Sequence, residues 1–236
     1  MVLNILHQDD SYVAIHKPSG LLVHRSPLDK LETEFAVELL GDQIGQQVHP
    51  CHRLDRPTSG VLLFALTSDA ARHAQEEFSQ RRVKKIYHAV VRGWPLEIGT
   101  IDYPLRSEET PEKIDEAVTN YTRVDQVEIG IPIGRYQQAR FSLIELRPLT
   151  GRKHQLRRHL AHIRHPIIGD TRHGDGAQNR FMREHFDCHR LLLHAEELRI
   201  ATPSRTSDLV IKADYDPQFY GALEALGLSN EPSGDA

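Results

Sequence analysis

The chain has 236 residues, of which 39% are hydrophobic and 26% charged, and its formal net charge is −4 at pH 7. This composition is typical of a globular protein and excludes a disordered or collagen-like chain. No apolar run approaches the roughly 20 residues that span a bilayer, and residues 1–10 lack the basic flank and long apolar core of a signal peptide. Two isolated cysteines, Cys51 and Cys188, make no disulfide framework. We therefore expect a cytoplasmic protein that has no membrane partner.

The first part of the chain predicts strands separated by turns and one helix. Three segments have the alternation or continuous apolar content of β-strands, namely residues 12–16, 60–66 and 86–92. Residues 17–20 are Lys-Pro-Ser-Gly, which predicts a turn. Ser68 is expected to cap a helix that carries Ala71, Ala74 and Phe78 at helical spacing.

The second part predicts another strand and a helix. Residues 106–117 are polar and contain a proline, so we interpret them as a surface insertion. Residues 141–146 form a strand that leads into a helix with Leu156, Leu160 and Ile163 on one face. Arg157 lies beside this apolar stripe and therefore needs a partner, and His165-Pro166 is expected to end the helix. The fold class is α+β, a mixed, mostly antiparallel sheet flanked by helices and loops in one domain over residues 1–236.

A loop of ionisable and turn-forming residues precedes the apolar run at 60–66. It reads His52-Arg-Leu-Asp-Arg-Pro-Thr-Ser-Gly60, with Asp55 between Arg53 and Arg56. Neighbouring positive charge keeps a carboxyl group ionised, and an ionised carboxylate can act as a nucleophile or a base. The alternative for such a loop is a capped turn with surface ion pairs.

The most basic part of the chain lies between residues 135 and 190, with 12 Lys+Arg against 5 Asp+Glu. Arg152, Lys153 and the backbone amides at the start of the predicted helix are suited to cradling a phosphate. A clustered excess of positive charge in an acidic protein indicates a polyanion partner such as nucleic acid. The alternative is a solvated helix face.

The histidines give no metal motif. His154, His159, His162, His165 and His173 are close in sequence, but they form no His-Glu-x-x-His pattern, and no carboxylate is spaced to join His159 and His162. A third segment, Lys84-Lys-Ile-Tyr-His-Ala89, carries a tyrosine on a predicted strand. Tyr87 is suited either to the core or to stacking on a base.

Together these segments resemble the RluA family of pseudouridine synthases. The most specific element is His52-Arg-Leu-Asp55 followed by Thr58-Ser-Gly60, and three further segments follow in the family's order: Lys85-Ile-Tyr-His-Ala89, Gly151-Arg-Lys-His-Gln-Leu-Arg157 and Pro166-Ile-Ile-Gly-Asp170. Residues 18–25, 42–45 and 165–175 are most similar to members that modify uridine 65 of tRNA. The signature begins by residue 17, so we expect no N-terminal S4 domain.

The resemblance implies a reaction and a set of roles. A uridine base is detached from C1′ of its ribose, turned over and rejoined through C5, with Asp55 as the catalytic carboxylate. Tyr87 matches the tyrosine that stacks on the extruded base, and Arg157 matches the arginine that pairs with the aspartate. We expect RNA, most of all tRNA, to contact Arg53, Arg56, Arg152, Lys153 and His154. We expect a monomer with no cofactor and no metal.

Other functions remain open at this point. The same family contains enzymes that act on ribosomal RNA or on other tRNA positions. A glycosidase normally needs two carboxylates flanking the bond, whereas these motifs supply only Asp55. A non-catalytic RNA-binding protein would need the basic surface but not Asp55.

Overall fold

The computed structural model describes residues 1–25, 33–108, 110, 112–134, 136–202 and 206–230. Their internal contacts divide the chain into two compact units, Met1–Lys85 with Ala195–Asp214, and Ile86–His194 with Tyr215–Ala236. Two strands pass from one unit into the other along the chain, β5 (Lys84–Arg92) and β11 (Leu193–Ile200). A single catalytic domain over residues 1–236 stays a prediction.

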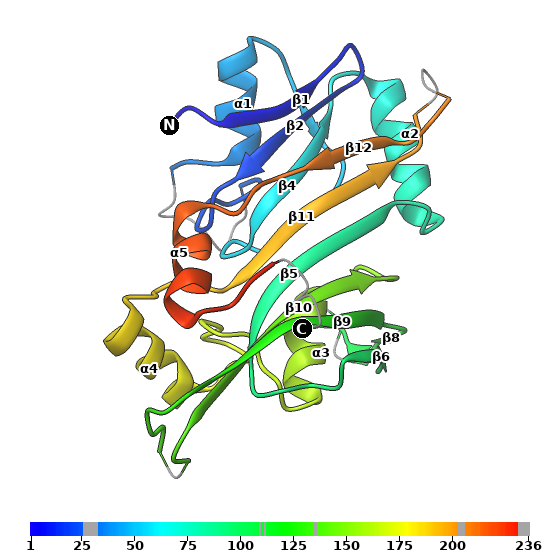
Figure 1. Cartoon of the computed structure of the whole chain (residues 1–236). Coiled ribbons are helices and arrows are strands. Elements are labelled where there is room, and N and C mark those ends of the chain that lie inside the picture. The colour runs from blue at the N-terminus through cyan, green and yellow to red at the C-terminus, as the bar shows by residue number, and fades with distance from the viewer. Residues whose placement is uncertain (26–32, 109, 111, 135, 203–205, 231–236) are drawn as a thin grey trace. The chain divides into compact units, whose positions relative to one another are not determined.

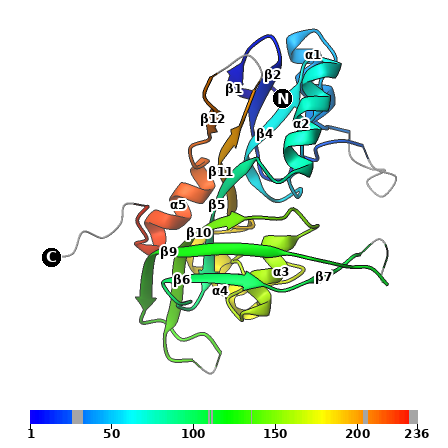
Figure 2. The same ribbon diagram turned by 90° about the vertical axis from the view of Figure 1, so that its right-hand side faces the viewer.

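The first unit is a sheet with two helices. Its other elements are β1 (Asn4–Gln8), β2 (Tyr12–Lys17), α1 (Ala36–Ile44), β3 (His49–Pro50), β4 (Ser59–Ala65), α2 (Ser68–Ser79) and β12 (Leu209–Lys212). The strand order is β1-β2-β4-β11-β12, with β3 also on β4, and the β1–β2, β2–β4 and β11–β12 pairs are antiparallel. Both helices lie on the same side of these strands (Figures 1 and 2).

The two strands predicted in this unit are confirmed. All seven residues of β4 are buried, as a continuous apolar run requires when both faces of a strand are covered. On one face Tyr12, Leu63 and Ala74 belong to the same core cluster. The predicted helix is also present, but its cap was wrong by one residue. The Thr67 hydroxyl, not Ser68, accepts the Ala70 amide at 3.2 Å, so Ser68 is the first helical residue.

The second unit is a twisted antiparallel sheet with helices on both faces. Its elements besides β5 are β6 (Ile98–Asp102), β7 (Leu105–Arg106), β8 (Ile114–Asp115), β9 (Val118–Ile129), β10 (Ala139–Pro148), α3 (Gln155–His162), α4 (Gly176–Phe186) and α5 (Pro217–Leu226). The strand order is β5-β10-β9-β6, and β7 and β8 form a separate antiparallel pair.

Alternation along β5 and β10 separates two cores in this unit. Ala89 and Val91 face Leu156 and Leu160 of α3, whereas Val90 packs with Phe181 of α4 and with α5. Successive side chains of a strand point to opposite faces, so one strand serves both cores. The predicted strands over 86–92 and 141–146 are therefore confirmed.

The α3 helix ends earlier than His165-Pro166, where the sequence analysis placed its end. Its last residue is His162, and Arg164 adopts the left-handed conformation with φ 66°. The predicted stripe is otherwise confirmed, because Leu156 and Leu160 are buried and Ile163 packs against the same cluster. The left-handed residue ends the α conformation before the proline restriction applies.

The predicted α+β class is confirmed. The described residues form five helices, a large sheet and a second sheet of two strands. Within the described ranges, no helix combines the length and the apolar character that crossing a membrane requires. The segment at 106–117 was interpreted as an insertion. Its described residues include β8 and part of the β7–β8 pair, and residues 109 and 111 lie outside the described residues.

Candidate active site

Asp55 lies in a half-buried loop of the first unit, directly before β4. Its carbonyl oxygen accepts the Thr58 amide at 2.9 Å, which closes a tight turn. Arg53 and Arg56, its predicted RNA-binding neighbours, are exposed. The Arg56 guanidinium also donates through Nε to the Gly20 carbonyl at 3.0 Å, so this side chain has a structural contact as well.

Main-chain contacts fix this loop against the turn at residues 17–20. The Lys17 ammonium is fully buried and donates to the carbonyl oxygens of Pro18, Leu21 and Arg56 at 2.9, 2.8 and 3.0 Å. The Ser19 hydroxyl donates to the Pro57 carbonyl at 2.8 Å. A buried ammonium with three acceptors is well satisfied, and these contacts hold the loop through backbone atoms rather than through the Asp55 side chain.

Gly60 allows the loop to meet β11 within the first unit. Its φ is +112°, and a Cβ atom there would lie 2.1 Å from the Ala195 carbonyl oxygen. Any other residue would therefore clash with backbone and be strained as well. This explains why glycine follows Thr58 and Ser59 in the motif, and it fixes the point at which the Asp55 loop becomes a strand.

His52, which precedes Asp55 in the same loop, is neutral and structural. Its Nε2 accepts the Leu63 amide at 3.1 Å, and its ring stacks on Phe78. Burial, with the charge of Lys85 as a second cause, lowers the pKa of His52 to about 3. Burial also lowers the pKa of Lys85 to about 8. A neutral His52 is not a proton donor near pH 7.

In the second unit, Gln155 organises the start of α3. Its Oε1 accepts the Thr150 hydroxyl at 2.7 Å and the Arg152 amide at 3.0 Å. Its Nε2 donates to the Val118 carbonyl at 3.1 Å. His154 precedes the helix in the left-handed conformation and makes no capping hydrogen bond through its side chain. Gln155 thus ties the chain that enters α3 to the first residue of β9.

Arg157 forms a buried two-pronged ion pair with Asp170. Nε and Nη2 donate to the two carboxylate oxygens at 2.7 and 2.9 Å, and the two residues are 5% and 2% exposed. Burial alone would raise the pKa of Asp170, but the hydrogen bonds from Arg157 and from the His173 and Arg172 amides hold the pKa below its ordinary value.

The Arg157–Asp170 pair confirms that Arg157 is buried and has a partner. Arg157 was expected to be partly buried with a partner, and Asp170 is a partner that we did not assign to it. The signal was available, because Asp170 closes the Pro-Ile-Ile-Gly-Asp motif that follows the helix. The pairing of Arg157 with Asp55 stays a prediction.

The three predicted phosphate ligands at the start of α3 have acidic partners from the β7–β8 segment. Lys153 lies 3.3 Å from the Glu108 carboxylate, and His154 Nδ1 lies 3.7 Å from it. The Arg172 guanidinium contacts the same carboxylate at 3.1 Å, and Arg152 lies 3.9 Å from Asp115. Any RNA phosphate must therefore compete with these carboxylates.

Glu108, His154 and His173 form a possible metal-ligand set, because one ligand atom of each lies within 4.8 Å of the others. The sequence predicted no carboxylate spaced to join His159 and His162, and Glu108, which is far away in sequence, instead joins His154 and His173. Lys153 and Arg172 already neutralise Glu108, which opposes a cation at this place. The absence of a metal stays a prediction. His159 has another role, since it is buried and contacts Thr119 and the Tyr103 carbonyl.

Tyr87 lies on β5, opposite Leu146 of β10, and is half-buried. Its ring packs against the cluster that contains Leu156 and Leu160. A half-buried ring of this kind keeps an accessible portion that can stack on a base. Its stacking role is not tested by this position alone and stays a prediction.

The comparisons with known proteins assign the class. A family model described as RNA pseudouridylate synthase matches residues 11–162. The chain therefore belongs to the RNA pseudouridylate synthase family, as its motifs indicated, and its reaction class is the isomerisation of uridine in RNA.

The comparisons also find highly similar relatives. A protein of Vibrio cholerae serotype O1 named tRNA pseudouridine synthase C is 50% identical over 235 residues, which cover 96% of each chain. A protein of the same name from Yersinia pestis is 51% identical and covers 97% of this chain and 92% of its own. The solved structure of human RNA Pseudouridylate Synthase Domain Containing 4 has a TM-score of 0.77 at 27% identity, and covers 97% of this chain and 94% of that one.

Proposed function

We propose that this enzyme isomerises a uridine of tRNA, and that the uridine is at position 65. The observation that carries the proposal is the roughly 50% identity, over nearly the whole chain, to relatives named tRNA pseudouridine synthase C. The position follows from the resemblance of residues 18–25, 42–45 and 165–175 to members that modify uridine 65. We further propose that the enzyme acts as a monomer in the cytoplasm, where its two free cysteines stay reduced.

Asp55 is the proposed catalytic carboxylate. In the balanced reaction the N1–C1′ bond breaks, a C5–C1′ bond forms, N1 gains a proton and the proton on C5 is lost. A carboxylate can promote this by adding to the nucleotide or by removing a proton. The position of Asp55 on a backbone-held turn supports this role, because a fixed carboxylate loses little freedom on reaction. The reaction transfers no hydride, phosphoryl group or electron, so the proposal includes no cofactor or metal.

Tyr87 and Arg157 have proposed roles that follow from the family motifs. A base inside folded RNA must leave its stack before it can react, at a cost of a few kcal/mol. Tyr87 would stack on the extruded base, and Arg157 would keep the catalytic carboxylate ionised. Arg53, Arg56, Arg152, Lys153 and His154 would contact phosphates, the last three after exchanging their acidic partners.

The test uses tRNA labelled with tritium at uridine C5. The proposed reaction releases tritium to water while the RNA chain stays intact, and mapping places the pseudouridine at position 65. A glycosidase would leave an abasic site, and a binding protein would do neither. Ribosomal RNA labelled in the same way is the control. Release from ribosomal RNA alone, or from another tRNA position, would replace the proposed substrate.

A further inference from the structure

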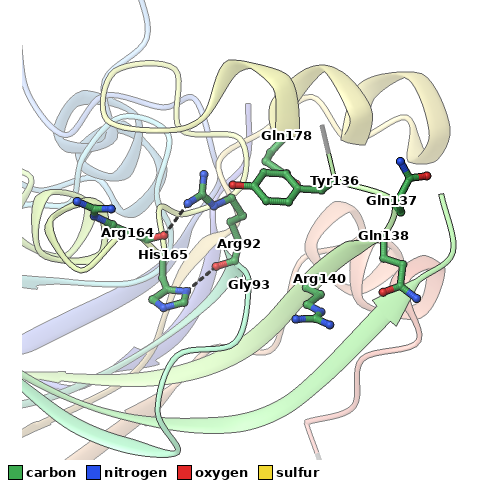
Figure 3. Close-up of a pocket in the computed structure, with 9 residues that line it drawn as sticks. All are labelled: Arg92, Gly93, Tyr136, Gln137, Gln138, Arg140, Arg164, His165 and Gln178. Carbon is green, nitrogen blue, oxygen red and sulfur yellow. Dashed lines mark hydrogen bonds between the residues drawn. The ribbon is translucent and has the colours of Figure 1, made fainter. Parts of the chain in front are cut away.

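The second unit contains a cavity of about 360 Å³ that none of the proposed catalytic residues lines. Its walls come from the end of β5, the connection between β9 and β10, the chain after α3, and α4 (Figure 3). Ligand pockets in proteins have volumes of roughly 300–1,000 Å³, so this cavity is large enough for one planar ring system. Four separate segments must fold together to form it.

One wall of the cavity is rigid. The Arg92 guanidinium donates to Asp175 at 2.7 Å and to the Arg164 carbonyl at 3.0 Å, and the Arg92 carbonyl accepts His165 Nδ1 at 2.8 Å. Figure 3 shows the last two contacts as dashed lines. Because Asp175 also caps α4 by accepting the Ala177 amide at 2.9 Å, Arg92 is fixed to the helix start as well. A ligand would therefore meet a preformed surface.

The first turn of α4, which also lines the cavity, carries a buried hydrogen-bond acceptor that lacks a donor among the described residues. The Gln178 side chain extends from α4 toward the ring of Tyr136 (Figure 3), and Gln178 is only 6% exposed. Its Oε1 atom has no hydrogen-bond partner among the described residues. Leaving a buried acceptor unpaired costs free energy, which a ligand N–H group at this position would recover.

The charges in the cavity are balanced, but the charge at its rim is not. Asp175 neutralises Arg92, and Glu128 neutralises Arg140. Arg164 is exposed, its guanidinium extends away from the cavity in Figure 3, and it makes no ion pair in the described part of the chain. The cavity thus favours an uncharged group, while the rim favours an anion next to it.

The cavity and its rim therefore favour an uncharged planar ring that has N–H donors and is attached to an anion. The base and the phosphate of a nucleotide have these properties. Tyr136 is 52% exposed and offers a ring on which a base can stack. Gln137, Gln138 and Gln178 offer amides, which pair with the donor and acceptor edges of bases. We infer that this cavity binds the base of one unpaired nucleotide of the RNA substrate, other than the uridine that reacts, with its phosphate on Arg164. The inference rests on the proposed function.

Two variants test the cavity directly. Gln178→Leu removes the acceptor at similar size, and Arg164→Ala removes the rim charge. Each should weaken binding of unmodified full-length tRNA about fivefold, the equivalent of one hydrogen bond, and raise KM while leaving kcat unchanged. Arg164→Ala should also lower the salt slope by about one phosphate contact. Gln75→Leu and Arg72→Ala, exposed changes on α2 outside the cavity and outside the basic 135–190 segment, are the matched controls and should bind tRNA normally.

An abasic scan identifies the nucleotide. Each unpaired residue of the tRNA is replaced by an abasic residue, and the dissociation constant is measured in the Asp55→Asn background so that no turnover occurs. At one position the abasic change should weaken tRNA binding by the Asp55→Asn protein about fivefold. The same change should hardly affect binding by the Asp55→Asn, Gln178→Leu double variant, because that variant already lacks the contact. Normal binding by both cavity variants, or no position coupled to Gln178, overturns the inference. The inference is also overturned if free nucleosides bind the cavity but no abasic position of the tRNA is coupled to Gln178.

The scan separates this inference from the proposed function. If wild-type protein releases no tritium from tRNA, the proposed function fails, whatever the binding data show. If tritium release is normal but no abasic position couples to Gln178, only the cavity assignment fails. Arg164 is exposed, so Arg164→Ala keeps the test valid even if Gln178→Leu were to unfold the protein.

Discussion

The loop that carries Asp55 and the segment from Thr150 to Asp170 are held in different ways. In the first, side chains bind backbone atoms: the Lys17 ammonium donates to three carbonyl oxygens, the Arg56 guanidinium donates to the Gly20 carbonyl, and His52 accepts the Leu63 amide. In the second, the motif side chains themselves make the contacts, as in the buried Arg157–Asp170 pair. Contacts to the backbone thus fix the turn that carries Asp55, whereas the Arg157–Asp170 pair makes two motif side chains part of the stability of the second region.

The largest expected effect is that of Asp55→Asn. Amide and carboxylate have nearly the same size, and the contacts of Lys17 and Ser19 hold the loop through the carbonyl oxygens of Arg56 and Pro57. We expect turnover of tRNA to fall by about 10³-fold or more, while the melting temperature and the dissociation constant for tRNA change little. Tritium release, thermal unfolding and filter binding measure the three quantities. Turnover close to wild type would remove Asp55 from the mechanism.

The Arg157–Asp170 pair should behave in the opposite way. Removing one partner leaves an uncompensated buried charge, so Arg157→Ala should destabilise the fold by about 3–5 kcal/mol. Asp170→Asn should be destabilising for the same reason. Arg157→Lys should rescue poorly, because an ammonium lacks the planar two-pronged geometry. Urea unfolding of the three variants gives the free energies.

The pH–rate profile then separates structure from catalysis at Arg157. If Arg157 also keeps Asp55 ionised, its loss raises the Asp55 pKa and moves the onset of activity to higher pH. Asp170→Asn is the matched control, since it breaks the same ion pair but keeps the guanidinium, and its profile should not move. Identical profiles for both variants would leave Arg157 with a structural role only, and Arg53 or Arg56 would have to take the catalytic one.

The sequence predicted features that depend on neighbouring residues, and it did not predict contacts between residues far apart in the chain. The strands at 12–16 and 60–66 follow from alternation or apolar content within a few residues, so both were found. Arg157 was marked as needing a partner, but its partner is Asp170, which lies beyond a helix end and a turn. Such a pair depends on tertiary folding and cannot be read from helical periodicity.

The same reasoning explains two further omissions. Glu108 reaches Lys153 and His154 from a segment that was interpreted only as an insertion. The cavity near Gln178 is assembled from four segments, and a glutamine on a helix has no sequence pattern that marks it as a buried acceptor. Even a local feature can be misplaced, because Thr67 and Ser68 are both good caps and only the backbone conformation selects one.

His52 tests whether the Asp55 loop depends on pH for its stability. Burial lowers its pKa from the ordinary 6.5 to about 3. Between these values the unfolded chain binds a proton that the folded chain does not, so stability should fall as the pH drops from about 6.5 toward 3. His52→Gln, which keeps an acceptor for the Leu63 amide, should make this loss shallower. Equal slopes in unfolding experiments across this range would contradict the assignment.

Substitutions at Tyr87 should have a smaller effect. Tyr87→Phe keeps the ring, whereas Tyr87→Ala removes a stacking platform worth roughly 1–3 kcal/mol per base. We expect Tyr87→Phe to bind tRNA like wild type and Tyr87→Ala to bind it more weakly, with both dissociation constants measured in the Asp55→Asn background. If both variants bind and react equally, Tyr87 does not stack on the base.

The smallest expected effect comes from the acidic partners of the α3 segment. Glu108 contacts Lys153 and Arg172 at 3.3 and 3.1 Å, so RNA must displace it to reach them. These pairs are partly exposed and individually weak, of order 0.2–1 kcal/mol. Glu108→Gln should therefore tighten tRNA binding by a few fold, whereas Lys153→Ala should weaken it and lower the salt slope by about 0.7–0.9. Glu145→Gln, which removes a carboxylate paired with Arg147 elsewhere in the unit, is the control for a change in net charge. If Glu108→Gln tightens binding no more than Glu145→Gln does, the gain is a general effect of charge, and the α3 segment does not contact the RNA in the way its motif suggests.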